Sequence, residues 1–430
     1  MARRVYRNSE AHLERAERVV PLASQTFSKS RVQFPVGAAP LFITRGKGAR
    51  VWDVDENEYV DFINGLAAVN LGYGDPDVNS AIEAQLQAGT IFSLPHPLEC
   101  EVAELLVEMV PCAEMVRFGK NGSDATTAAI RLARACTSRD RVAVCGYHGW
   151  QDWCIGSTSR SLGVPEAVRE LTHPFPYDDC NALAELLNQY PGEFAAVILE
   201  PVNSQEPGEG YLNSVREVTH QQGALLIFDE TITGFRVARG GAQELYGVAP
   251  DLATFGKGMA NGMPLSAVVG SAEYMRKMED IFFSTTFGGE TLSLAAAKAV
   301  LTKIKNAPVI ERLNDLGKRL KQKLGNVIHT HQLQNILQLS GLPAWTFLTI
   351  TKKERDVSMA IRAYLIQELC GRGFLSIGTH NISFAHTEND VDRLCDAYDG
   401  ILPKLCLALK EDELTNSLNG KPLSPIFPIR

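Results

Sequence analysis

From residue 76 onward, patterns typical of helices alternate with short apolar runs typical of β-strands. The helical patterns cover 76–89, 97–110 and 123–136. The apolar runs are Met115–Phe118, Arg141–Val144, Ala195–Leu199, Ala224–Phe228, Leu252–Phe255 and Ala267–Gly270. This alternation predicts an α/β fold in which a mostly parallel sheet is covered by helices on both faces. Such sheets bind ligands outside the carboxyl ends of their strands, so polar residues that follow each run are site candidates.

The two ends of the chain mix helical and strand-like patterns. Residues 7–20 predict an amphipathic helix that ends near Pro21. Three short runs then predict an antiparallel meander, at Leu41–Thr44, Arg50–Asp53 and Tyr59–Ile63. A long helical stretch at about 290–328 leads into the C-terminal portion. There we expect strands at Trp345–Thr351 and Ile382–Ala385 and helices near 356–371 and 388–409.

A chain of 430 residues is long enough for a large domain and a smaller one, given roughly 100–200 residues per domain. We expect residues 71–305 to form the large domain. The N-terminal helix and meander (1–70) and the C-terminal portion (306–430) are expected to associate as one smaller α+β domain.

Composition and charge exclude several classes of protein. The formal net charge is −8, whereas a protein that binds nucleic acid or an anionic membrane needs a basic face. The 9 cysteines contain no CxxC pair, so neither a metal site nor a disulfide framework is predicted. No run of about 18 apolar residues could span a bilayer, and the first 20 residues lack the apolar core of a signal peptide. We therefore expect a cytoplasmic protein.

Asp229 and Lys257 each come shortly after an apolar run, so their side chains are expected to meet in one cleft. A carboxylate that faces a pyridine nitrogen and an amine that faces an aldehyde are what pyridoxal 5′-phosphate (PLP) chemistry needs, because the protonated ring then acts as an electron sink. The alternative is a solvated ion pair at the strand ends, since such charges are mostly structural.

The residues around Lys257 favour the chemical interpretation. Gly256 and Gly258 flank the lysine and permit close backbone approach and unusual dihedral angles. The tight turn Asn261-Gly262-Met263-Pro264 follows. Partial desolvation of the amine would lower its pKa and make it competent as a nucleophile and general base.

Two further segments are candidates for cofactor binding. Residues 118–124 follow a strand-like run and open a helix, so backbone N–H groups, Ser123 and the positive helix end can meet a phosphate dianion. A simple helix cap at Ser123 or Asp124 is the alternative. Tyr147 follows the run Arg141–Val144, where its ring can stack on a planar cofactor or can instead pack in the core.

These segments occur together in the order found in a known family. The chain resembles the class III (ω-type) aminotransferases of PLP fold type I, and among them the glutamate-1-semialdehyde aminomutases and their relatives. The resemblance covers about residues 8–400. It is carried by Pro40-Leu41-Phe42-Ile43, Val51-Trp52-Asp53-Val54-Asp55, Asn121-Gly122-Ser123-Asp124-Ala125-Thr126, Ala129-Ile130-Arg131-Leu132-Ala133-Arg134, Tyr147-His148-Gly149, Glu200-Pro201-Val202, Asp229-Glu230-Thr231-Ile232-Thr233-Gly234-Phe235-Arg236 and Gly256-Lys257-Gly258.

The resemblance implies a role for each matching residue. Lys257 corresponds to the lysine that carries PLP as a Schiff base, and Asp229 to the partner of the pyridinium nitrogen. Tyr147 corresponds to the aromatic residue that stacks on the ring. The phosphate is expected to be held by Asn121, Gly122 and Ser123.

Two assignments and four departures complete the comparison with the family. One departure is Glu290-Thr291, where Asn-Pro is usual. Gln205 falls near a position that contacts the ring hydroxyl, and Thr286 matches a threonine that reaches the phosphate of the neighbouring subunit, which implies a homodimer. Residue 231 is Thr where relatives usually carry Val. Lys29 stands roughly where the aminomutase has an arginine for its substrate carboxylate, and Ser383 where many transaminases have an arginine that clamps an α-carboxylate.

The resemblance implies an aminotransferase that moves an amino group from a small-molecule donor to a ketone or aldehyde acceptor. Trp150 and Trp153 could line a pocket for a polar or carbohydrate-like acceptor, or they could be packing residues. One alternative is an intramolecular aminomutase, which needs the same residues but keeps one substrate bound throughout. The other is a non-catalytic protein with this fold.

Overall fold

The computed structural model describes residues 4–352, 354–420 and 423 and divides into two compact units. The first unit takes its described residues from 4–75 and 311–423, and the second consists of 76–310. The two boundaries fall a few residues after those expected at 70/71 and 305/306. Every predicted site residue except Lys29 and Ser383 belongs to the second unit.

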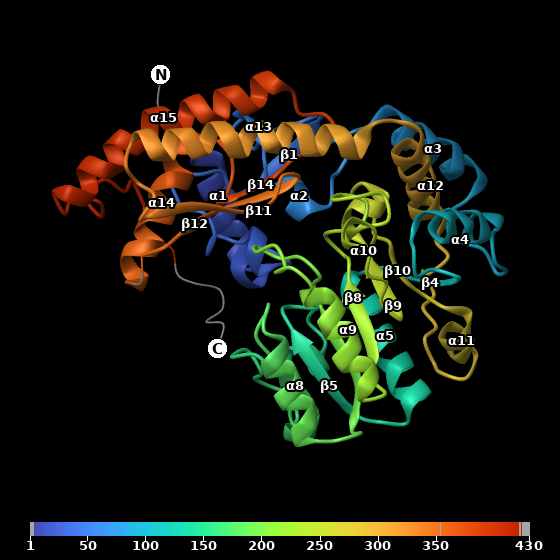
Figure 1. Ribbon diagram of the computed structural model, residues 1–430. Helices are drawn as coiled ribbons and strands as arrows, with labels where there is room; N and C mark the ends of the chain where they lie inside the picture. The colour runs from blue at the N-terminus through green and yellow to red at the C-terminus, as the bar shows by residue number, and fades with distance from the viewer. Residues whose placement is uncertain (1–3, 353, 421–422, 424–430) are drawn as a thin grey trace. The chain divides into compact units, whose positions relative to one another are not determined.

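The second unit is built on a sheet with the strand order β4-β10-β9-β8-β7-β5-β6. Figure 1 labels β4, β5, β8, β9 and β10 of this sheet. The strands are β4 (Met115–Gly119), β5 (Arg141–Cys145), β6 (Thr172–Pro174), β7 (Phe194–Leu199), β8 (Leu225–Asp229), β9 (Leu252–Phe255) and β10 (Ser266–Gly270). All neighbours from β6 to β9 pair in parallel, whereas β10 is antiparallel to both β9 and β4. The link 256–265 is too short for a parallel crossover, which needs about a dozen residues or more.

Successive side chains of these strands are buried on opposite faces of the sheet. On one face, Val142, Val144, Ala196 and Ile198 share a core with helix α5 (Gly122–Thr137). On the other face, the intervening residues share a core with α8 (Cys180–Gln189) and α9 (Tyr211–Gln221). Burial on both faces explains the continuous apolar runs of the sequence. The predicted α/β class with a mostly parallel, helix-covered sheet is confirmed.

The remaining helices of the second unit surround this sheet or carry its loops. They are α3 (Pro76–Ala88), α4 (Pro97–Met109), α6 (Asp152–Ile155), α7 (Glu166–Arg169), α10 (Ala242–Tyr246), α11 (Ala272–Met275) and α12 (Thr291–Asn306). Within the described ranges, no helix of either unit combines the length and apolar character that crossing a bilayer requires.

The first unit joins the two ends of the chain. Strand β3 from the N-terminal segment pairs in parallel with β13 from the C-terminal segment, with Val60 opposite Phe374. The sheets are β1-β2-β3-β13 and β11-β12-β14, formed by β1 (Ile43–Lys47), β2 (Arg50–Asp53), β3 (Glu58–Asp61), β11 (Leu337–Leu342), β12 (Trp345–Ile350), β13 (Phe374–Leu375) and β14 (Thr379–Asn381). The helices are α1 (Arg7–Glu17), α2 (Asn64–Ala67), α13 (Val309–Thr330), α14 (Arg355–Gly371) and α15 (Glu388–Lys410).

Two expectations about secondary structure are wrong. The stretch 290–328 is not one helix but α12 and α13, which are interrupted at Ala307 and Pro308, because proline disfavours helical geometry in the residue before it. Ile382–Ala385 is not a strand. The chain turns there because the backbone N–H of Ser383 donates to His386 Nδ1 (3.0 Å), which gives the backbone a local partner in place of a neighbouring strand.

Candidate active site

The carboxyl ends of four strands gather the candidate residues at one edge of the sheet. Asp229 is the last residue of β8, and Lys257 follows the neighbouring strand β9 by two positions. Glu200 comes directly after β7, and Tyr147 follows β5. This is the edge at which parallel sheets bind ligands.

Asp229 is a buried carboxylate that the surrounding donors keep ionised. His148 Nδ1 lies 2.8 Å from Asp229 Oδ2, while Thr231 N (3.0 Å) and Thr254 Oγ1 (3.2 Å) donate to Oδ1. Burial alone would raise the pKa of Asp229, but the hydrogen bond and charge of His148 and the donors of Thr231 outweigh it and hold that pKa below its ordinary value. An ionised acid here can stabilise a cation at a bound ring nitrogen.

His148 is a site residue that the sequence did not single out. Its Nε2 lies 3.0 Å from the carbonyl oxygen of Cys145, which can only accept a hydrogen bond. Its Nδ1 faces the Asp229 carboxylate, so both ring nitrogens face acceptors, an arrangement that favours the imidazolium form. Burial acts to lower the pKa of His148, but the hydrogen bond and the charge of Asp229 act more strongly in the opposite direction, so the pKa is raised. Thr126 Oγ1 donates to the backbone carbonyl of His148 (2.6 Å) and anchors this loop on α5.

Lys257 combines backbone strain with a half-buried side chain. Its φ is +42°, a left-handed conformation that costs a residue with a side chain roughly 1–3 kcal/mol and is found at functional sites. Gly256 and Gly258, expected to supply the unusual dihedral angles, both lie outside this left-handed region. Burial lowers the pKa of Lys257, although the charges of Glu200 and Asp229 act against that shift.

The turn between β4 and α5, residues 120–124, offers donors that no protein group uses. Asp124 Oδ2 accepts the N–H groups of Lys120 (3.0 Å) and Asn121 (2.8 Å), so these amides, which the sequence suggested for a phosphate, are already bonded. In the described part of the chain, no protein acceptor takes the N–H of Gly122, the N–H of Ser123 or the Ser123 hydroxyl. These donors open helix α5 and suit a phosphate dianion. We call residues 120–124 the phosphate turn.

Close backbone packing brings the phosphate turn against two other loops. A Cβ on Gly149, which has φ +119°, would lie 2.5 Å from Ser123 Cβ, and a Cβ on Gly122 would lie 3.0 Å from Thr231 Cγ2. Only glycine tolerates such approaches. Tyr147 is 54% exposed, so its ring is not a core residue and has a face to offer a planar ligand.

Glu200 is a second residue whose chemistry the sequence did not reveal. Burial, together with the charge of Asp229, raises the pKa of Glu200 to about 7. Gly146 makes room for it, because a Cβ there would lie 3.1 Å from Glu200 Oε1. The position directly after a predicted strand was the available signal, as it was for Asp229.

Gln205 and Thr286 do not join this cluster within the chain. Gln205 is exposed in the loop after β7, where its N–H donates to Asn203 Oδ1 (2.8 Å). Thr286 is exposed in the loop before α12. Within the described residues, no hydrogen bond or ion pair links either side chain to Asp229, Lys257 or the phosphate turn. Both assignments stay predictions.

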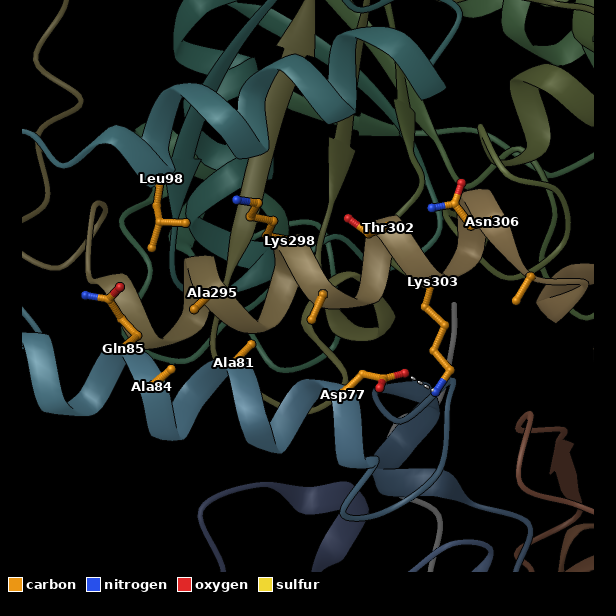
Figure 2. Close-up of a pocket in the computed structure, with 12 residues that line it drawn as sticks. Asp77, Ala81, Ala84, Gln85, Leu98, Ala295, Lys298, Thr302, Lys303 and Asn306 are labelled. Carbon is orange, nitrogen blue, oxygen red and sulfur yellow. Dashed lines mark hydrogen bonds and ion pairs between the residues drawn. The ribbon is translucent and has the colours of Figure 1, made fainter.

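A separate groove of about 710 Å³ lies between α3, α4 and α12 (Figure 2). Its lining is rich in alanine, and the ion pair of Lys303 with Asp77 (2.8 Å) borders it. None of the predicted site residues lines this groove. The chemistry-bearing side chains gather at the strand ends instead, so that edge of the sheet is the candidate active site.

Comparisons with known proteins show the family of the chain. Residues 33–388 match the model of the family Aminotransferase class-III. Curated relatives include a 3-aminobutyryl-CoA aminotransferase from Cloacimonas acidaminovorans, 35% identical over 83% of this chain and 88% of the relative. They also include a glutamate-1-semialdehyde 2,1-aminomutase from Natranaerobius thermophilus, 32% identical over 93% of this chain and 99% of the relative.

Solved structures give the same result. The FumI protein of Sphingopyxis sp. MTA144, in its PLP internal aldimine form, has a TM-score of 0.88 at 29% identity and covers 96% of this chain and 98% of its own. An omega-transaminase from Sphaerobacter thermophilus has a TM-score of 0.84 at 28% identity, with 92% and 97% covered. These likenesses confirm the predicted PLP fold type I. The chain belongs to the class III aminotransferases, and its cofactor is PLP.

Proposed function

We propose that this protein is a transaminase that uses the residues at the strand ends to move an amino group from a small-molecule donor to a ketone or aldehyde. The observation that carries the proposal is that an ionised, buried Asp229 and a half-buried Lys257, whose pKa is lowered by desolvation, follow neighbouring strands at one edge of the sheet. A solvated ion pair would show neither the burial nor the His148 partner.

Lys257 and Asp229 have complementary tasks in this proposal. PLP, when bound, supplies the electron sink that makes the substrate C–H bond acidic. The lowered pKa of Lys257 increases the fraction of neutral Nζ, which acts as nucleophile toward a carbonyl carbon and as acceptor of a proton from the substrate carbon. Asp229 keeps a proton on the ring nitrogen, and His148 keeps Asp229 ionised while it does so.

The other residues bind and orient the cofactor. Gly122 N, Ser123 N and Ser123 Oγ donate to the phosphate at the positive end of α5, and Asn121 caps that helix. Tyr147 stacks on one face of the ring, which its exposure supports. Gln205 contacts the ring hydroxyl in this proposal, although its side chain is exposed in the loop after β7.

We further propose a homodimer in which Thr286 reaches the phosphate of the partner subunit. Phe282 and Phe287, on either side of Thr286, are large apolar residues with more than half of their surface exposed. Thr291 N donates to Thr90 O (2.9 Å), and the segment that follows Thr90 carries exposed Ile91, Phe92 and Leu94. Contiguous exposed apolar residues mark protein interfaces. These exposed residues support a dimer through the Thr286 segment.

The substrate is constrained by what the chain does not offer. Ser383 is buried, and its hydroxyl lies 2.9 Å from His386 Nδ1, so it supplies no charge for an α-carboxylate. One relative is named 3-aminobutyryl-CoA aminotransferase, and this name is consistent with an amino donor whose amine is not α to a carboxylate. Trp153 is a packing residue whose Nε1 donates to Thr127, whereas Trp150 is exposed and could contact a polar acceptor.

An intramolecular aminomutase is the second candidate. The relative from Natranaerobius thermophilus, which is matched over nearly its whole length, carries that name. Both reactions need the same cofactor contacts. They differ in whether a separate acceptor is consumed.

The first experiment is a covalent and spectroscopic test of Lys257. Wild-type protein reduced with borohydride in the presence of PLP should carry the cofactor on Lys257, and Lys257→Ala should carry none. Lys298→Ala, which removes an exposed lysine of α12, is the matched control and should be modified normally. A Lys257→Ala protein that still forms the adduct would contradict the assignment.

The second experiment identifies the reaction. Amino donors are screened by the change in cofactor absorbance in a half-reaction, and keto acid or aldehyde acceptors are then added. A transaminase turns over only with a donor and an acceptor. Turnover of a single amino aldehyde without any acceptor would instead identify the aminomutase.

A further inference from the structure

Basic side chains from β4 and α5 hold the segment that carries Thr286. Arg117 of β4 donates to the carbonyl oxygen of Phe283 (3.0 Å), and Arg131 of α5 donates to that of Phe282 (2.5 Å). These two elements flank the phosphate turn. The segment 282–290, which precedes α12, is therefore tied to the elements that position the phosphate turn.

A third contact reaches this segment from the phosphate turn itself. Lys120 Nζ lies 3.0 Å from Glu290 Oε2, and both side chains are only 16% exposed. Glu290 also caps α12, because Oε1 accepts the N–H of Leu292 (2.7 Å) and Oε2 accepts the N–H (3.2 Å) and hydroxyl (2.7 Å) of Ser293. Burial acts to raise the pKa of Glu290, but the donors of Ser293 and Lys120 hold it below the ordinary value. The carboxylate is thus fixed in place before it meets the lysine.

The backbone at both ends of this ion pair is fixed as well. Lys120 N donates to Asp124 Oδ2, the carboxylate that also shapes the start of α5 next to the free N–H groups. At the other end, Glu290 N donates to Phe287 O (3.1 Å) and Gly288 N to Thr285 O (3.1 Å), so Thr286 lies in a turn that Glu290 ends. A shift of the phosphate turn would therefore move the Thr286 segment with it.

We propose that the Lys120–Glu290 ion pair is a positioning device that couples phosphate occupancy of the turn to the subunit surface around Thr286. Phosphate binding at Gly122 and Ser123 then orders the 282–290 segment and tightens the dimer. Dimer formation tightens PLP binding by the same factor, because coupling between two binding equilibria is reciprocal. The inference rests on the proposed function, namely on PLP at this turn and on a dimer through Thr286.

The burial of the pair distinguishes it from the ion pairs on the outer surface of α12. Lys298 of α12 pairs with Glu101 at 2.6 Å, but these side chains are 48% and 43% exposed. Exposed pairs are weakened by water and salt and contribute little. Lys298→Met is therefore a matched control that removes an ion pair from the same helix.

The test measures dimer dissociation constants of the apo and holo forms by sedimentation. Lys120→Met, Glu290→Gln, the double variant and Lys298→Met are compared with wild type. In wild type, PLP should tighten the dimer by roughly 5-fold to 150-fold, a usual range for coupled sites. Lys120→Met and Glu290→Gln should each reduce this factor several-fold, the double variant no further, and Lys298→Met not at all. Pyridoxal, which has no phosphate, should tighten the dimer less than PLP.

The variants are chosen to separate positioning from loss of the fold. Glu290→Gln retains an oxygen that can accept from Leu292 N, so α12 keeps its cap, and thermal unfolding checks each protein. An unchanged coupling factor in Lys120→Met would overturn the inference. So would additive losses in the double variant. If PLP does not tighten the wild-type dimer but the Lys257 adduct still forms, the inference is overturned and the proposed function stands. Absence of that adduct rejects the proposed function as well.

Discussion

Replacement of His148 by asparagine would remove the positive charge beside Asp229 but leave a neutral donor near the position of Nδ1. His148 Nδ1 and Asp229 Oδ2 are 2.8 Å apart, and both side chains are buried. Without the imidazolium, burial dominates and raises the pKa of Asp229, so the carboxylate is protonated over a wider acidic range. We expect His148→Asn to bind PLP more weakly and to lose PLP at a higher pH than wild type.

The size of this effect follows from the geometry of the pair. Two unit charges about 4 Å apart attract by about 4 kcal/mol at an effective dielectric constant of about 20. Desolvation of the imidazolium offsets part of that attraction. The expected loss of PLP binding free energy in His148→Asn is then about that of a hydrogen bond to a charged group, about 1.5–3 kcal/mol. This corresponds to roughly a 10-fold to 150-fold higher dissociation constant for PLP.

The assay is an absorbance titration with PLP at a series of pH values. His220→Asn is the matched control, because His220 Nε2 lies 2.9 Å from Asp251 Oδ2 in a pair that is partly exposed. Exposed pairs contribute about 0–1 kcal/mol, so this variant should bind PLP as wild type does. If His148→Asn binds PLP with wild-type affinity and loses PLP at the same acidic pH as wild type, then the ionisation of Asp229 does not depend on His148.

Asp229→Asn should retain some PLP but lose most of its half-reaction rate, because a neutral amide cannot keep the ring nitrogen protonated; a wild-type rate would contradict this role. Thr286→Val should weaken PLP binding by roughly 1–3 kcal/mol, whereas Thr286→Ser, which keeps the hydroxyl, should not. Stability should fall as the pH drops from about 6.5 to about 4, because burial lowers the pKa of His380 and of His386 to about 4 and the unfolded chain therefore binds more protons in this window. The loss should approach about 3 kcal/mol for each histidine in denaturant unfolding, and a free energy of unfolding that does not change across this window would show that these histidines are not buried in the neutral form.

Asp229 and Lys257 could be predicted from the sequence because each comes shortly after an apolar run. The carboxyl ends of parallel strands meet at one edge, so two such residues converge wherever their strands are neighbours. The structure pairs β8 with β9, and Asp229 lies opposite Thr254, three residues before Lys257. The phosphate turn followed from the same rule at β4 and α5. The sequence also named Gly122 and Ser123, whose donors have no protein acceptor among the described residues, but it did not show that Asp124 Oδ2 accepts the N–H of Asn121.

His148 and Glu200 could not be predicted as partners, because their contacts depend on strand order. His148 and Asp229 are 81 residues apart, and their strands β5 and β8 are not neighbours, since β7 lies between them. The loop after β5 must therefore pass the end of β7, where the half-buried Glu200 follows that strand. Periodicity describes each strand by itself and carries no information on which strand lies beside which.

The family motif around Asp229 shows the same limit within a single run of residues. Glu230 is the next residue and is equally buried, yet its carboxylate accepts the N–H groups of Ala242 (2.7 Å) and Gln243 (2.9 Å). Side chains alternate along a strand, so these two neighbouring acids point in opposite directions. One faces the cofactor edge, and the other secures the turn that leads to α10. The motif helps to identify the family, but only the geometry separates the residues that do chemistry from those that hold the loop.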